Sequence, residues 1–241
     1  MSPEDRTRRR DDLAKRLTET RIEGRKRCWV VGCIEPPGNV SSDSLGRFCR
    51  RHLEHHRRHG DALKASYKAI QIRPCRTAAR AWLKRYGEHL HVKAAVKRIE
   101  ALMLTSGRTI APNRLRGMSP KAKAQAVWAR LREREVSAYE VLASILAVVI
   151  CHEGDHQKAT REYRQVQVAK VINRMAGGTV KRWPTHHTDP TLPKVKVLRW
   201  FPASEGLVLR KLGETAEVAA EFLVHDHIEE LAAFAKSRVA R

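Results

Sequence analysis

Three cysteines and one histidine lie within 25 residues at the spacing of a structural zinc site. Four residues separate Cys28 from Cys33, and two separate Cys49 from His52. Structural zinc takes four tetrahedral sulfur and nitrogen donors. Gly32 favours a tight turn between the first pair, and the second pair falls at i and i+3 at the start of an expected helix, so both side chains leave one face. The sequence therefore predicts one structural zinc ion held by Cys28, Cys33, Cys49 and His52.

Other cysteines and histidines leave alternatives open. His55, His56 and His59 are further candidates for the fourth ligand, and His56 is the second choice because it lies on the same face one turn later. Cys75 and Cys151 are isolated in the sequence, and we expect them to be buried apolar side chains. Five cysteines, three of them clustered, do not form the pattern of a disulfide framework, so a metal site in a reducing compartment is preferred.

The cysteine and histidine pairs are followed by the run Arg57-Arg58-His59-Gly60-Asp61. Residues 28–61 as a whole resemble the short zinc module of phage and mobile-element proteins, which often accompanies endonucleases of the HNH and recombination-endonuclease-VII kind. Leu53 and His56 depart from the usual Tyr and Trp, and the loop between the ligand pairs is longer than usual. The resemblance implies a treble-clef-like zinc module. The matching positions are Cys28, Gly32, Cys33, Cys49, His52, Arg57, Arg58, His59, Gly60 and Asp61.

The nuclease half of that resemblance is missing from the sequence. An HNH site needs a histidine base, a second metal-binding histidine and an asparagine within a ββα-metal hairpin. Runs 151–156, 186–189 and 225–227 contain histidine and aspartate, but none is followed by an Asn…His tail at hairpin spacing. We therefore predict no catalytic residues. A metal-dependent endonuclease with a degenerate site, involving His152 or His186, is the alternative.

Charge indicates a polyanionic partner. The chain of 241 residues has a formal net charge of +22, and its sequence pI is about 10.5. Residues 1–200 have a net charge of +24, and residues 201–241 a net charge of −2. Nucleic acid is the usual partner of such a basic protein. We predict binding to double-stranded DNA, with an RNA-binding or ribosome-associated protein as the alternative.

The expected organisation is mainly α-helical, since aromatic residues are few and short helical patterns recur. Pro74 is expected to break the chain before a helix that runs to Tyr86. A glycine- and proline-containing linker is the predicted domain boundary. The predicted segments are a basic helical arm (1–26), the zinc module (27–61), a helical segment (62–106), the linker (107–118), a winged-helix-like domain (119–204) and two acidic helices (205–241).

The prediction of a winged-helix-like domain depends on the order of its elements. Helices at 120–133, 138–151 and 160–176 precede two strands, at 179–183 and 195–201, and the strands would form a β-hairpin wing. The alternative is an ordinary helical bundle with a basic face and a covering hairpin.

The predicted DNA contacts lie on the zinc module, on the third helix of this domain and on the wing. Arginine, lysine and glutamine suit phosphates and the base edges of a major groove. The residues are Arg50, Arg51, Arg57 and Arg58 on the module, Arg161, Arg164, Gln167, Lys170 and Arg174 on the third helix, and Lys181, Arg182 and Lys196 on the wing.

The ends of the chain complete the prediction. Residues 1–27 contain no apolar signal segment, and the apolar run 136–151 is too short and too polar to span a membrane, so we expect it to be a buried helix.

The C-terminal helices, 206–212 and 214–238, would cover the protein itself or contact a partner, including a second copy. We therefore predict a zinc-containing, cytoplasmic, nucleoid-associated DNA-binding protein of phage or mobile-element type, acting in transcription regulation, recombination or DNA processing without catalysis of its own.

Overall fold

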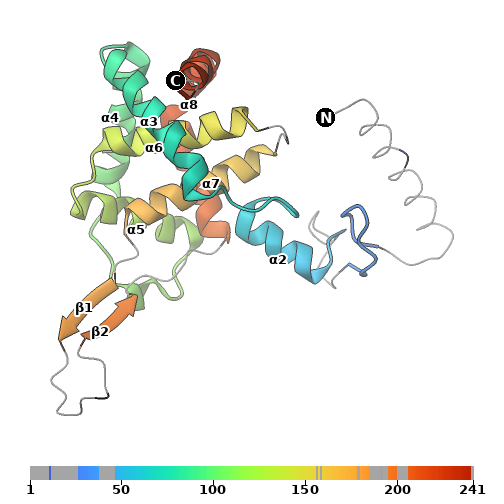
Figure 1. Cartoon of the computed structure of the whole chain (residues 1–241). Coiled ribbons are helices and arrows are strands. Elements are labelled where there is room, and N and C mark those ends of the chain that lie inside the picture. The colour runs from blue at the N-terminus through green and yellow to red at the C-terminus, as the bar shows by residue number, and fades with distance from the viewer. Residues whose placement is uncertain are drawn as a thin grey trace.

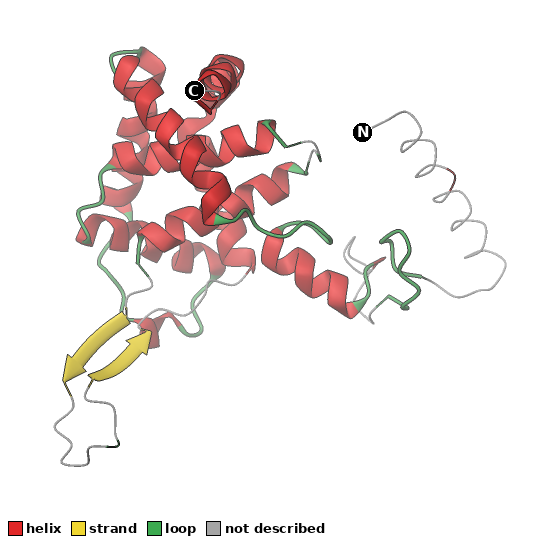
Figure 2. Cartoon of the chain, in the orientation of Figure 1, coloured by secondary structure: helices red, strands yellow, loops and turns green. Residues whose placement is uncertain are grey.

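The structure is a computed structural model, and most of its described residues are helical (Figures 1 and 2). The described residues are 11, 27–37, 47–155, 157, 159–177, 180–184, 191, 195–199 and 206–239. Apart from Asp11, the predicted arm 1–26 lies outside them. The elements are α2 (Arg50–His59), α3 (Ala69–Arg85), α4 (Leu90–Thr105), the 3-10 turn η2 (Pro112–Leu115), α5 (Pro120–Glu133), α6 (Ala138–Glu153), α7 (Arg161–Met175), β1 (Val180–Pro184), β2 (Val195–Arg199) and α8 (Gly206–Val239).

Helix α6 runs through the middle of the core. Every residue from Val141 to Ile150 is buried, as expected for a helix that is apolar on all sides. Helices α3, α4, α7 and α8 all pack against it. The prediction of a buried helix in this stretch is confirmed. None of the helices in the described part combines the length and apolar character needed to cross a bilayer.

Helix α8 is a single 34-residue helix, whereas the sequence led us to expect two. It packs against each of the helices α3 to α7 and buries apolar side chains that include Leu212 and Leu223. Gly213, near the expected break, serves for close packing. A Cβ atom at this position would lie 2.2 Å from the carbonyl oxygen of Gln165 on α7. Helices on both sides of residues 107–118 therefore contribute to one hydrophobic core.

The predicted winged-helix-like domain with a β-hairpin wing was wrong. The three helices assigned to it share their core with α3, α4 and α8, so together they form a larger helical bundle. Helix α7, the expected recognition helix, is enclosed between α6 and α8, and residues 166–169 are all buried. A helix in this position cannot lay an open face into a DNA groove.

The only strands among the described residues form one short ribbon. Strand β1 pairs antiparallel with β2, with Val180 opposite Arg199 and Pro184 opposite Val195. Figure 1 shows the ribbon projecting from the helical body. In the described part of the zinc module, 27–37 and 47–49 are turns and irregular segments, and residues 38–46 of the expected treble-clef-like module lie outside the described residues.

Local helix signals explain the starts of α5, α6 and α7. Ser119, Ser137 and Thr160 each precede a helix and accept a hydrogen bond from a backbone amide of its first turn. Pro74 was expected to stop a helix, but it lies inside α3. The helix begins five residues before Pro74, at Ala69, and continues through it to Arg85.

Candidate metal centre and basic groove

Two turns and the start of α2 bring the four predicted ligands together. Gly32 has a φ of 80°, and the amide of Cys33 donates to the carbonyl of Val30 across this turn. The amide of Trp29 donates to the carbonyl of Arg47, which brings the Cys28 segment beside the segment that leads into α2. Cys49 is the N-cap of α2 and His52 lies in its first turn, so the i, i+3 geometry expected from the sequence is confirmed.

The donor atoms have the separations that one tetrahedral ion requires. All four lie within 4.8 Å of one another. The Sγ atoms of Cys33 and Cys49 are 3.9 Å apart, and His52 Nδ1 lies 3.4 Å from Cys28 Sγ and 3.2 Å from Cys49 Sγ. A zinc tetrahedron has edges of about 3.8 Å between sulfurs and about 3.6 Å between sulfur and nitrogen, from its usual bond lengths. The cluster can therefore hold one metal ion such as zinc.

The protonation chemistry of two of the ligands favours metal binding. Burial raises the pKa of Cys49, but hydrogen bonds from the backbone at His52 and Arg51 and from neighbouring thiols outweigh it, so that the pKa is lowered. Burial, together with the charge of Arg51, lowers the pKa of His52 and favours its neutral form. A thiolate and a neutral imidazole are the forms that bind a metal ion.

The alternative fourth ligands are engaged elsewhere. His55 Nδ1 lies 2.9 Å from the carbonyl oxygen of Asp61. His56 Nε2 lies 3.6 Å from Glu162 on α7. His59 Nδ1 lies 2.9 Å from Ser66 Oγ, and burial lowers the pKa of His59 to about 4. His52 is therefore the histidine that completes the cluster.

The C-terminal end of α2 is fixed to the bundle through its last carbonyl groups. The last carbonyls of a helix have no partner within the helix. Gln167 of α7 donates to the carbonyl of His59 at 3.0 Å, and Arg210 of α8 donates to the carbonyls of His56 and Arg57. Figure 1 shows α2 at the edge of the helical body, between the bundle and the segment 27–37. These contacts orient the metal module relative to α7 and α8.

The arginines predicted to contact DNA on the module lie at the surface. Arg50, Arg51, Arg57 and Arg58 are all exposed on α2, and Arg50 pairs with Glu54 on the same helix. A cavity of about 320 Å³ beside the cluster is lined by Arg51 and Arg58 among others. The module therefore presents positive charge next to its metal ligands.

The α7 residues predicted to contact DNA are mostly used inside the molecule. Arg161 and Arg164 both pair with Glu217 of α8. Gln167 is only 2% exposed and makes the contact to α2 described above. Lys170 Nζ lies 3.2 Å from His59 Nδ1 and donates to Ser66, whereas Arg174 is exposed. The side chains of Lys181, Arg182 and Lys196 on the ribbon lie outside the described residues.

A basic groove between α3 and α7 was not predicted from the sequence. It has a volume of about 670 Å³, and Arg73, Arg76 and Arg80 of α3 line it together with Arg174 of α7. Arg80 pairs with Glu140, but the other three arginines form no ion pair with any residue that the structure describes. Burial and the nearby charge of Arg80 lower the pKa of Arg76, and its Nε has no hydrogen-bond partner in the described part of the chain.

The sequence does contain a signal for this groove. Positions 73, 76 and 80 follow i, i+3, i+7 spacing, which places them along one face of a continuous helix. The expected break at Pro74 obscured the pattern, because it left Arg73 outside the helix that contains Arg76 and Arg80. Lys170 lies one turn before Arg174 on α7, and burial together with the charge of Arg174 lowers its pKa to about 8. A series of arginine and lysine side chains thus extends from the groove to the end of α2.

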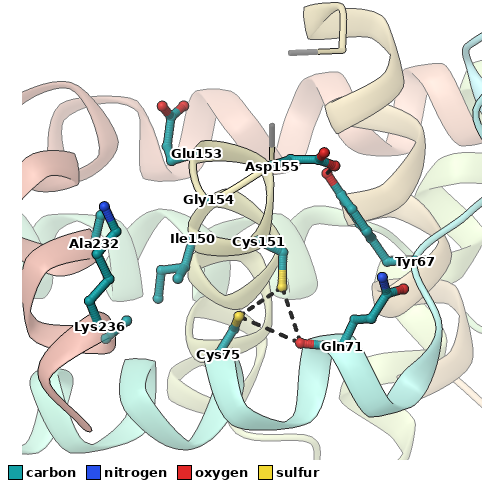
Figure 3. A pocket seen from close by; sticks show the side chains of 11 residues that line it. Tyr67, Gln71, Cys75, Ile150, Cys151, Glu153, Gly154, Asp155, Ala232 and Lys236 are labelled. Carbon is teal, nitrogen blue, oxygen red and sulfur yellow. Dashed lines mark hydrogen bonds between the residues drawn. The ribbon is translucent and has the colours of Figure 1, made fainter. Parts of the chain in front are cut away.

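A second cavity contains the two cysteines that are isolated in the sequence (Figure 3). Its volume is about 610 Å³, and Cys75 of α3 and Cys151 of α6 line it with their Sγ atoms 2.8 Å apart. Both thiols also lie near the carbonyl oxygen of Gln71, at 3.6 Å and 3.4 Å. The cysteines were expected to be unrelated buried side chains, but the packing of α3 on α6 makes them neighbours and leaves both partly exposed.

Three of the histidines considered for a nuclease site are among the described residues, and all three lie on helices. His152 is on α6, where its Nε2 lies 3.2 Å from the carbonyl oxygen of Ala159, and His225 and His227 are on α8. None of these three is part of a β-hairpin. Residues 186–189 lie outside the described residues.

Comparisons with protein-family models, with curated proteins and with solved structures give no match for this chain. The resemblance of residues 28–61 to the phage and mobile-element module therefore stays a prediction. Any function has to be argued from the chain's own residues.

Proposed function

We propose that this protein binds nucleic acid through phosphate contacts, with zinc in the Cys3His cluster stabilising one part of the binding surface. The observation that carries the proposal is the groove between α3 and α7, where three arginines lack an ion-pair partner among the described residues. Arginine recognises phosphate with a planar, bidentate set of donors. A polyanion is the ligand that complements such a surface.

The lowered pKa values of Arg76 and Lys170 support an anionic ligand. Burial is the main cause at both side chains, and the charges of Arg80 and Arg174 add to it, while Glu140 offsets part of the effect at Arg76. A phosphate in the groove would favour the charged forms, and the relief of this repulsion would add to binding. The excess positive charge of residues 1–200 supports the same class of ligand.

Helix α2 extends the surface. Lys170 lies beside His59 at the end of α2, and Arg57 and Arg58 are exposed in the last turn of that helix. A zinc ion would hold the start of α2, while Gln167 and Arg210 hold its end. In this proposal the metal has a structural role, and it positions arginines without contacting the nucleic acid.

Duplex DNA is the partner that we prefer, and competition with RNA tests this choice. Labelled duplex DNA is titrated with the zinc-loaded protein at low salt, and structured RNA and unlabelled duplex are added as competitors. We expect the protein to bind the labelled duplex, and unlabelled duplex DNA to displace it more effectively than structured RNA does. Arg76→Ala should weaken duplex binding several-fold. Arg85→Ala, at the other end of α3, is the matched control and should leave binding unchanged. Stronger competition by RNA would assign the surface to RNA, and absence of binding at low salt would refute the proposal.

A further inference from the structure

A second group of metal-ligand residues lies far from the Cys3His cluster in the sequence. His89 is the N-cap of α4, His91 is in its first turn, and His227 is on α8. The ring centroids are 5.1 Å apart for His89 and His91, 4.6 Å for His89 and His227, and 5.5 Å for His91 and His227. Each ring offers one nitrogen, and these atoms lie within 4.8 Å of one another. Three rings from two helices thus converge at one point.

One nitrogen of each ring lies beside a carboxylate or a backbone amide. The amide of His91 donates to His89 Nδ1 at 3.3 Å, as an N-cap contact. His91 Nδ1 lies 3.1 Å from Asp226 Oδ2, and His227 Nδ1 lies 3.4 Å from Glu230 Oε2. A carboxylate beside the second nitrogen, as at His91 and His227, is usual for metal-bound histidines. Metal binding through His89 Nε2 would place the proton on Nδ1 and replace the contact with the His91 amide.

His91 Nδ1 is buried and forms no hydrogen bond with a described residue, although Asp226 lies beside it. His227 Nε2 is buried and has no hydrogen-bond partner among the described residues. Burial of a polar atom without a hydrogen-bond partner costs free energy, and a role as a metal ligand would account for this cost. Trp82 Nε1 donates to Glu230 at 3.3 Å, which holds the carboxylate that orients His227. The carboxylates of Asp226 and Glu230 thus lie beside two of the three rings.

We propose that His89, His91 and His227 form a second metal site, for one divalent transition-metal ion such as zinc. Imidazole nitrogen suits zinc, copper and nickel, whereas magnesium and calcium prefer oxygen. The described residues supply three donors here and His89 is exposed, so we assign the fourth position to water. The ion would connect the start of α4 to α8. This proposal does not depend on nucleic-acid binding.

The test is a Co²⁺ titration of the full-length, metal-free protein. Co²⁺ in the Cys3His cluster gives sulfur-to-cobalt charge transfer, whereas a histidine site gives only ligand-field bands. We expect two equivalents to bind the natural protein, the second without additional charge transfer. His89→Ala and His227→Ala should each weaken the second equivalent at least tenfold, and Glu230→Gln should weaken it about 10- to 100-fold.

The matched control is His225→Ala, an exposed histidine on the same helix outside the cluster, which should still bind two equivalents. His89 is exposed, so His89→Ala tests the site even if His227→Ala disturbs folding. Binding of a single equivalent by the natural protein would overturn the proposal. So would a second equivalent that shows thiolate charge transfer, or one that His89→Ala leaves unchanged.

Discussion

The side-chain amide of Gln167 donates a 3.0 Å hydrogen bond to the carbonyl oxygen of His59, and this contact fixes the end of α2 to α7. Gln167→Ala would leave the carbonyl without this partner next to the core. We expect a loss of about 1–3 kcal/mol in the free energy of unfolding, the usual cost of an unsatisfied buried polar group. Urea unfolding measures the loss. Gln125→Ala, an exposed glutamine on α5, is the control and should have little effect.

The same contact accounts for the difference between the expected and the observed surroundings of Gln167. A glutamine among basic residues on a helix is a reasonable candidate for reading DNA, and periodicity alone does not reveal a neighbour 108 residues away. The ligands Cys28, Cys33, Cys49 and His52 could be predicted because their spacing is itself the chemical requirement. The starts of α5, α6 and α7 could be predicted because Ser119, Ser137 and Thr160 act within one turn.

Tertiary contacts account for what could not be predicted. Gly213 resembles a helix stop in the sequence, but it is required for the approach of α8 to α7. The histidine cluster of α4 and α8 and the arginine groove of α3 and α7 each join segments that lie far apart in the chain. No local pattern indicates which helix faces which.

Gly213 permits a direct test of the packing of α8. Gly→Ala at an unconstrained helical site usually stabilises a protein, by about 0.4–1 kcal/mol. Here the added Cβ would lie 2.2 Å from the carbonyl oxygen of Gln165, so we expect Gly213→Ala to destabilise the protein by about 1–3 kcal/mol. Thermal or urea unfolding shows whether the variant is less or more stable than the natural protein. A stabilised variant would show that α8 and α7 do not approach this closely.

Loss of one thiolate ligand should release the metal ion from the Cys3His cluster. The buried apolar core around this cluster consists of Cys28, Val30 and Cys49 alone among the described residues, too little to fold without a metal. We expect Cys49→Ser to lose one equivalent of zinc in elemental analysis and to expose residues 47–59 to hydrogen exchange, while the main core remains folded.

Cys75→Ser, outside the cluster, is the control for this experiment and should retain the zinc. Full zinc content in Cys49→Ser would contradict the assignment of Cys49 as a ligand.

Cys75 should be the more reactive thiol of the pair in the second cavity. A hydrogen bond from Cys151 lowers the pKa of Cys75, whereas this contact and burial raise the pKa of Cys151 (Figure 3). Alkylation at neutral pH should therefore modify Cys75 first. Cys151→Ala removes the donor, so the pKa of Cys75 should rise and its labelling rate should reach half its maximum at a higher pH. Mass spectrometry of the labelled protein measures both rates, and an unchanged pH profile in the variant would exclude the contact.

The salt dependence of duplex DNA binding tests most directly whether the α3/α7 groove contacts phosphate. Each phosphate contact adds about 0.9 to the negative slope of log K against log salt concentration. If Arg73, Arg76 and Arg174 each contact a phosphate, replacing all three by alanine should make the slope shallower by about 2.7. Arg85→Ala should leave the slope unchanged. A triple variant with the slope of the natural protein would contradict the proposed surface.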